Sequence, residues 1–253
     1  MDLILDIGNT NVVTGLLDAG KVHVVDRLET SSSLDAVFMQ RYYSDFLLEN
    51  AIAIDQINHI VVSCVVSELL DPIVQSTEAY FGKKVKVMNA DLIMNLPFHI
   101  PKPYEIGSDL VANALHVHSS YDENAIIIDY GTALTFTIFS KEEGIQGVTI
   151  APGLKTSINA LSNNTSKLPE VEIDFPESAI GKNTAHAIQA GVLYGYVGLV
   201  REIIHRIKSE VGEDYKLVVT GGLSHVLKPL EDIYDFVDRD LTLKGIQDTI
   251  PFF

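Results

Sequence analysis

The feature that most constrains the fold is a short pattern that occurs twice, about half of the 253-residue chain apart. Asp6-Ile7-Gly8-Asn9-Thr10 and Asp129-Tyr130-Gly131-Thr132-Ala133 each follow an apolar β-type run and precede another. In both halves a glycine-bearing turn, at 18–20 and at 141–144, then leads into a third β-type run. A repeat of this length indicates two related α/β domains. The alternative is coincidence, because Asp-x-Gly turns are common at strand ends.

Hydrophobic periodicity predicts alternating strands and helices along the rest of the chain. The segment 95–103 contains three prolines, which exclude a regular helix or strand there, so we expect a loop or linker. We expect one domain over residues 1–118 and a second over 119–253. The predicted strands are 3–7, 11–17, 23–28, 57–66, 85–88, 125–129, a following ribbon through 139, and 216–220, and the predicted helices are 34–50, 68–81, 109–118 and 184–210.

Charge and cysteine content exclude several classes of protein. With 18 basic and 34 acidic residues the net charge is −16, which disfavours nucleic acid and anionic lipid as partners and argues against a transcriptional activator. The single cysteine, Cys64, allows no intrachain disulfide and no multi-cysteine zinc site. We see no basic segment before Lys21 and no apolar run near the ~18 residues of a membrane span, so we expect a cytoplasmic protein without a membrane partner.

Three turns could bind a nucleotide. Asp6, Asn9 and Thr10 in the first turn, and Asp129 and Thr132 in the second, offer backbone N–H groups and oxygen ligands to phosphates and a cation. Gly221 and Gly222, after a predicted strand, would let backbone approach a purine or ribose. Each turn alone is more simply a structural Asx turn, but the three in order favour a nucleotide phosphotransferase.

Three further patterns occur in the sequence: a possible P-loop, a pair of histidines that could bind zinc, and a row of glycines in a predicted helix. Gly181-Lys182-Asn183-Thr184 is not a P-loop, because it lacks the preceding glycine and the hydroxyl residue after lysine. His116 and His118 are too close in a helix to share a face, so we interpret them as core or solvated residues. Gly191, Gly195 and Gly198 lie on one helix face and imply close backbone approach, either to the sheet or to a second subunit.

Taken together, the two Asp-x-Gly turns, Gly107-Ser108-Asp109, Pro152-Gly153, Gly181-Lys182-Asn183-Thr184, Thr220-Gly221-Gly222 and the segment 240–245 resemble type III pantothenate kinase over nearly the whole chain. The resemblance implies two related actin-like, ribonuclease-H-like domains with mixed sheets flanked by helices. It implies ATP-dependent phosphorylation of pantothenate to 4′-phosphopantothenate, the first step of coenzyme A biosynthesis. It also implies a homodimer that uses a monovalent cation (K⁺ or NH₄⁺) and a divalent cation such as Mg²⁺.

The resemblance also assigns roles to residues. Asp109 would accept the proton of the substrate hydroxyl, Asp129 would bind potassium, and Thr184 would reach the substrate across a dimer interface. The remaining pantothenate positions would be Ile100, Gly107, Ser108 and Leu110, beside Asp109 and Thr184. The ATP positions would be Asp6, Ile7, Gly8, Asn9, Thr10, Asn11, Val12, Val13, Thr132, Gly221 and Gly222.

Three positions depart from the family pattern. Leu110 stands where the family usually has arginine, Thr137 where it has aspartate, and Ile100 where a pocket tyrosine is frequent. The departures leave a second function open, that of a catalytically impaired homologue that binds nucleotide or a protein partner in a regulatory role.

Overall fold

The computed structural model describes residues 1–164, 168–169 and 171–253. The chain divides into two compact units, one formed by Met1–Asp122 with Asp240–Phe253 and the other by Glu123–Arg239. The expected domains, 1–118 and 119–253, differ from this division mainly at the end of the chain, where the last segment packs with the first unit.

The first unit contains a five-stranded mixed sheet. β1 (Asp2–Ile7), β2 (Asn11–Asp18) and β3 (Lys21–Glu29) form an antiparallel meander, as the sequence predicted. β4 (His59–Cys64) and β5 (Lys86–Val87) run parallel to β1, so the strand order is β3-β2-β1-β4-β5. The parallel pairing places the carboxyl ends of β1 and β4 at the same edge of the sheet.

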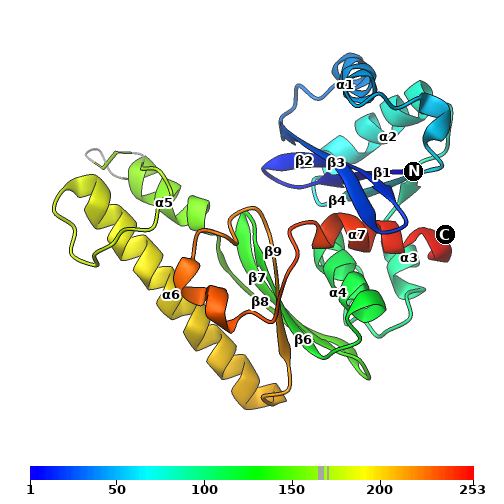
Figure 1. Ribbon diagram of the computed structural model, residues 1–253. Coiled ribbons are helices and arrows are strands. Elements are labelled where there is room, and N and C mark those ends of the chain that lie inside the picture. Colours follow the sequence, from blue (N-terminus) through cyan, green and yellow to red (C-terminus); the bar gives the residue numbers. More distant parts are fainter. Residues whose placement is uncertain (165–167, 170) are drawn as a thin grey trace. The chain divides into compact units, whose positions relative to one another are not determined.

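Helices of the first unit pack on this sheet (Figure 1). α1 (Ala36–Glu49) and α2 (Ser67–Phe81) form a core with β1 and β4. α1 begins where Asp35 accepts a 2.8 Å hydrogen bond from the N–H of Phe38, and α2 ends at Gly82, whose φ is +64°. α4 (Ser108–Ser120) and α7 (Leu241–Asp248) pack together and against the same sheet, and α3 (Ala90–Met94) is a short helix that the sequence analysis missed.

α7 is held tightly to the first unit. A Cβ at Gly245 would overlap the backbone of Ala112 in α4, so only glycine permits this approach of the two helices. The Thr242 hydroxyl donates to Asn113 Oδ1 at 2.8 Å. Close backbone contact together with buried polar pairing explains why the last segment belongs to this unit.

The α4–α7 pair also accounts for one of the two histidines. His116 is buried, and its Nδ1 lies 2.8 Å from Asp248 Oδ2 in α7. His116 is therefore a core residue with a hydrogen-bond partner, as the sequence analysis expected.

The second unit repeats the topology of the first. β6 (Ala125–Tyr130), β7 (Ala133–Ser140) and β8 (Gly144–Pro152) form an antiparallel meander. β9 (Lys216–Thr220) and β10 (Phe236–Val237) continue the sheet in parallel with β6. The order β10-β9-β6-β7-β8 is that of the first sheet read from the other end, with β6 in the place of β1 and β9 in the place of β4. The prediction of two related domains is confirmed.

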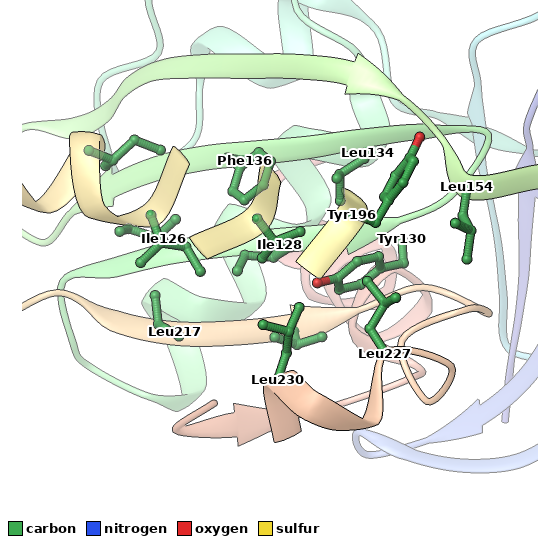
Figure 2. Packing of buried hydrophobic residues seen from close by; sticks show 14 of the residues in the cluster. Ile126, Ile128, Tyr130, Leu134, Phe136, Leu154, Tyr196, Leu217, Leu227 and Leu230 are labelled. Atoms are coloured by element: carbon green, nitrogen blue, oxygen red, sulfur yellow. The ribbon is translucent and has the colours of Figure 1, made fainter. Parts of the chain in front are cut away.

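One face of the second sheet carries the core shown in Figure 2. Ile126, Ile128 and Phe136 from the sheet pack with residues of α6 (Thr184–Val211), and α5 (Leu154–Asn163) adds Leu154. By length and composition α6 could cross a membrane, although its apolar residues do not form one continuous run. Because Leu193, Tyr196, Val200, Ile204 and Ile207 of α6 are buried in this core, we interpret it as a core helix.

The glycine stripe of α6 does not face the sheet. A Cβ at Gly191, Gly195 or Gly198 would meet nothing within 4 Å in the part of the chain that is described. The interpretation that these glycines allow close packing on the sheet is therefore wrong. The second interpretation, contact with another subunit, stays a prediction.

Candidate active site

In the first unit, the turn between β1 and β2 is closed by backbone bonds and one threonine. The N–H of Gly8 donates to the carbonyl of Asn11 at 3.0 Å. Thr30, directly after β3, donates its hydroxyl to the carbonyl of Gly8 at 2.7 Å and its N–H to the carbonyl of Thr10 at 2.9 Å. These bonds occupy the turn carbonyls of Gly8, Thr10 and Asn11, and the side chains of Asn9 and Asn11 are exposed.

The other positions assigned to this ATP segment divide by burial. Ile7, Val12 and Val13 are buried, and their strands β1 and β2 are each paired on both sides, so these residues support the turn from within the sheet. Asp6 and Thr10 are partly exposed and remain the polar side chains at the start of the turn. Beside Asp6, burial raises the pKa of the Cys64 thiol and the Asp6 carboxylate raises it further, so this cysteine is a poor nucleophile.

Asp109 lies in the first turn of α4. Gly107 precedes the helix in an extended conformation, and a Cβ there would overlap Asp109 Oδ1, so the glycine makes room for the carboxylate. Asp109 Oδ1 accepts the N–H of Leu110 at 3.0 Å. Burial raises the pKa of the Asp109 carboxyl, and hydrogen bonds from the N–H groups of Leu110 and of Asp109 itself oppose that rise. A raised pKa suits a group that must accept a proton during turnover.

Ser108 and the two apolar residues of this unit that were predicted to contact pantothenate are buried. Leu110 is 8% exposed and Ile100 is 7% exposed. Both side chains therefore pack in the interior of the unit, where apolar residues are favoured.

In the second unit, Asp129 lies in a row of three polar residues across one face of the sheet. Asp129 on β6 is paired with Thr135 on β7 and with Thr220 on β9, and paired residues direct their side chains to the same face. Thr135 is 9% exposed, and its hydroxyl has no hydrogen-bond partner among the described residues. The sequence analysis missed Thr135; its only signal was a hydroxyl residue within an apolar strand.

Two glycines pack closely around this row and the neighbouring turn. Gly221 follows Thr220 with a φ of +93°, and a Cβ there would lie 2.6 Å from Asp129 Oδ1. Gly153 donates its N–H to the carbonyl of Thr132 at 3.0 Å, and a Cβ on it would lie 2.7 Å from the carbonyl carbon of Thr132. Thr156 adds a 2.7 Å hydrogen bond from its hydroxyl to the same Thr132 carbonyl. The second turn is thus packed more closely than the first.

Thr184 is the first residue of α6. The side chain of Asn183 caps the helix by accepting the N–H of His186 at 2.9 Å. Thr184 is exposed and lies on the rim of an otherwise apolar hollow of about 290 Å³, which Leu161, Ile188 and Val192 help to line. The helix cap therefore fixes Thr184 at the edge of an apolar surface depression.

The first unit thus brings together the Asp6–Val13 turn and the start of α4, and the second brings together Asp129, Thr132 and Gly221. Thr184, at the start of α6, does not belong to this cluster of residues at the ends of the strands. No group of three His, Cys, Asp or Glu side chains is close enough to hold a metal ion within the described ranges. A cation here would use one carboxylate with hydroxyl, carbonyl or phosphate oxygens, which suits K⁺ or Mg²⁺ better than zinc.

Comparison with known proteins decides the family. A family model described as type III pantothenate kinase matches residues 2–206. A type III pantothenate kinase of Syntrophus aciditrophicus (strain SB) is 36% identical over 249 residues, which cover 98% of this chain and 97% of that protein. The chain belongs to the type III pantothenate kinase family. It is accordingly a kinase that phosphorylates pantothenate in coenzyme A biosynthesis.

Solved structures share the fold at low sequence identity. A Campylobacter jejuni protein described as a Baf family transcriptional activator is 20% identical with a TM-score of 0.60, over 98% of this chain and 97% of its own. The activator of 2-hydroxyisocaproyl-CoA dehydratase from Clostridium difficile, solved with ADPNP, is 11% identical with a TM-score of 0.57, over 99% and 95%. The chain therefore has the actin-like fold that the family resemblance implied.

Proposed function

We propose that Asp109 is the proton acceptor through which this chain transfers the γ-phosphoryl group of ATP to pantothenate. The carboxylate takes the proton of the pantothenate hydroxyl as the oxygen forms a bond to the γ-phosphorus, and the bond from that phosphorus to ADP breaks. The observation that carries the proposal is the placement of Asp109, held beside Gly107 at the start of α4 with its pKa raised by burial.

The turns at the strand ends would bind ATP. The Asp6–Val13 turn offers the exposed amides of Asn9 and Asn11 and backbone groups to the phosphates, and Thr132 offers a second contact. Gly221 and Gly222 would let the nucleoside approach backbone. Mg²⁺ would neutralise charge on the phosphates, since phosphoryl transfer depends mainly on positioning and charge neutralisation.

A monovalent cation would bind at Asp129. The fit rests on Thr135, whose buried hydroxyl oxygen has no partner within the described residues and is paired across the ladder with Asp129. A carboxylate beside hydroxyl oxygens is a suitable donor set for K⁺ or NH₄⁺. When bound, the cation would supply positive charge near the phosphates, and Asp129 would hold it.

We also propose that the protein is a cytoplasmic homodimer without a nucleic-acid or membrane partner. The three glycines of α6 with open space around them, and the exposed Thr184 beside an apolar hollow, support contact with a second copy. Gly195→Leu tests the dimer. We expect the dimer to dissociate while helix stability is kept or raised, because glycine costs ~1 kcal/mol in a helix interior. Sedimentation of both proteins measures this, and a wild type that sediments as a stable monomer at micromolar concentration would refute the dimer.

Asp109→Asn tests the proton acceptor. The amide keeps the shape but cannot accept the proton, so we expect kcat for pantothenate phosphorylation to fall about 10²- to 10⁴-fold. Unfolding is measured alongside. Since burial raises the pKa of Asp109, its ionisation opposes folding at a pH above that pKa. The variant should therefore gain stability at neutral pH, and the gain should disappear as pH falls below the ordinary aspartate pKa.

Two outcomes would contradict the assignment. Turnover within about threefold of wild type would show that Asp109 is not the proton acceptor. A loss of stability at neutral pH with unchanged turnover would show that the carboxylate serves only to cap the start of α4.

A further inference from the structure

Two buried serines join the start of α4 to the central strands of the first unit. Ser63 in β4 is fully buried, Ser108 is 6% exposed, and their hydroxyl oxygens lie 2.9 Å apart. Ser108 directly precedes Asp109, and Ser63 is paired in register with Asp6 of β1. One hydrogen bond therefore connects β4, which is paired with the strand that leads into the Asp6–Val13 turn, with the helix that carries Asp109.

General stability does not explain why this pair is present. Ser63 follows the apolar run Ile60–Val62 of β4 at a fully buried position, and replacing both partners of a buried hydrogen bond by apolar groups can be nearly neutral. A buried hydrogen bond of this kind does fix the distance between the two elements that it joins. Neither hydroxyl can bind water instead, so each keeps its hydrogen bond only while the other stays in place. What it fixes here is the place of the first helical turn of α4 relative to the edge of the sheet.

We propose that Ser63 is a positioning residue for Asp109. Through Ser108 it holds the first turn of α4 at the end of β1 and β4, and Gly107 leaves the space into which the Asp109 carboxylate fits. The inference rests on the proposed role of Asp109 as proton acceptor.

The effect on the reaction follows from geometry. A displacement of about 1 Å between reacting groups can cost ~10²-fold in rate. Removing the Ser63 hydroxyl lets the first turn of α4 move, but we expect Asp109 to move by less than this distance. For Ser63→Ala we expect kcat to fall about tenfold, while the KM for ATP stays within about twofold, since the Asp6–Val13 turn keeps its own bonds to Thr30. The acid limb of the kcat–pH profile should also shift, because the surroundings of Asp109 change.

Conservative and combined variants separate positioning from folding. Ser63→Thr keeps a hydroxyl, and the second unit has Thr220 at the corresponding place in its sheet, so we expect this variant to retain most of the activity. Ser63→Ala with Ser108→Ala leaves no unpaired hydroxyl and should recover stability but not kcat. In an Asp109→Asn background, Ser63→Ala should have no further effect on kcat.

A matched control is available in the same unit. The hydroxyls of Tyr43 and Thr77 form a buried 2.7 Å hydrogen bond in the α1–α2 core. Tyr43→Phe should lower the melting temperature and leave kcat and its pH profile unchanged. If Ser63→Ala behaves like Tyr43→Phe, the positioning role is overturned and the kinase mechanism is not. If Asp109→Asn keeps its activity, the proposed function itself fails, whatever Ser63→Ala does.

Discussion

The two halves of the molecule use one topology, but they build the turn after their first strand differently. In the first unit the residue that follows the third strand is Thr30, whose N–H and hydroxyl both bind the turn. In the second unit the corresponding residue is Gly153, where no side chain fits, and Thr156 supplies the hydroxyl instead. The acceptors differ as well, since Thr30 binds the carbonyl of Gly8, two residues after Asp6, and Thr156 binds that of Thr132, three residues after Asp129. The difference teaches that duplicated domains can each close a turn with a threonine hydroxyl taken from a different position.

The rows beside the two aspartates also differ. Asp6 lies between Val13 and the hydrogen-bonded Ser63, whereas Asp129 lies between Thr135 and Thr220. The ladder partner of Asp6 on β2, Val13, has an apolar side chain. The unpartnered hydroxyl of Thr135 gives the second row an oxygen that a cation can use.

The largest effect is expected when the closely packed turn receives a side chain. Gly153→Ala places a Cβ against the carbonyls of Gly131 and Thr132, so we expect a loss of about 3 kcal/mol or more in unfolding free energy. Thr30→Val, at the corresponding place, removes one hydrogen bond and should cost about 1 kcal/mol. Thermal unfolding compares the two, at roughly 2–4 °C per kcal/mol. Equal losses would show that the two turns are packed alike.

A smaller effect of opposite sign is expected from Thr135→Val. The change removes a buried hydroxyl without a partner, so the ligand-free protein should gain about 1 kcal/mol. The reciprocal change, Val13→Thr, places a hydroxyl at a buried position of the first row and should cost a similar amount. The melting temperature in potassium and in sodium salts provides the second measurement. Wild type should be stabilised selectively by potassium and Thr135→Val should not. Equal potassium stabilisation in both proteins would exclude Thr135 as a ligand.

The smallest effect is expected from Thr156→Val. Its hydrogen bond to Thr132 is exposed, and the N–H of Gly153 binds the same carbonyl, so we expect a loss of about 0.5 kcal/mol. Urea unfolding of Thr156→Val and Thr30→Val compares the two turns directly. A loss from Thr156→Val larger than that from Thr30→Val would mean that the side chain, and not the packing of Gly153, holds the second turn.

Local patterns predicted most of the fold. The strands that flank Asp6 and Asp129 were predicted within one or two residues, because each is a short apolar run bounded by turn residues. The related topology of the two sheets followed from the repeat. The packing of residues 240–253 with the first unit did not, because nothing near Gly245 in the sequence indicates the backbone of Ala112.

The site was predictable only where a motif carries it. Asp109 and Asp129 were proposed as site residues because their sequence neighbours resemble a family pattern. Ser63 was not, since its partner Ser108 is distant in sequence and serine in a strand has no distinctive pattern. The open surroundings of Gly191, Gly195 and Gly198 could not be foreseen either, because spacing places residues on a helix face without showing what lies opposite.

The position of α7 has a consequence for biosynthesis. Domains begin to fold as they leave the ribosome, from the N-terminus onward. The second unit is continuous in sequence, so all of its strands emerge before α7 does. The first unit must wait for α7, whose Gln247 accepts the N–H of Gly20 and donates to the carboxylate of Asp2. The domain whose synthesis starts first is thus the last to be completed, and ribosomes that stop before residue 240 release chains whose first domain lacks a packed helix and is exposed to proteases.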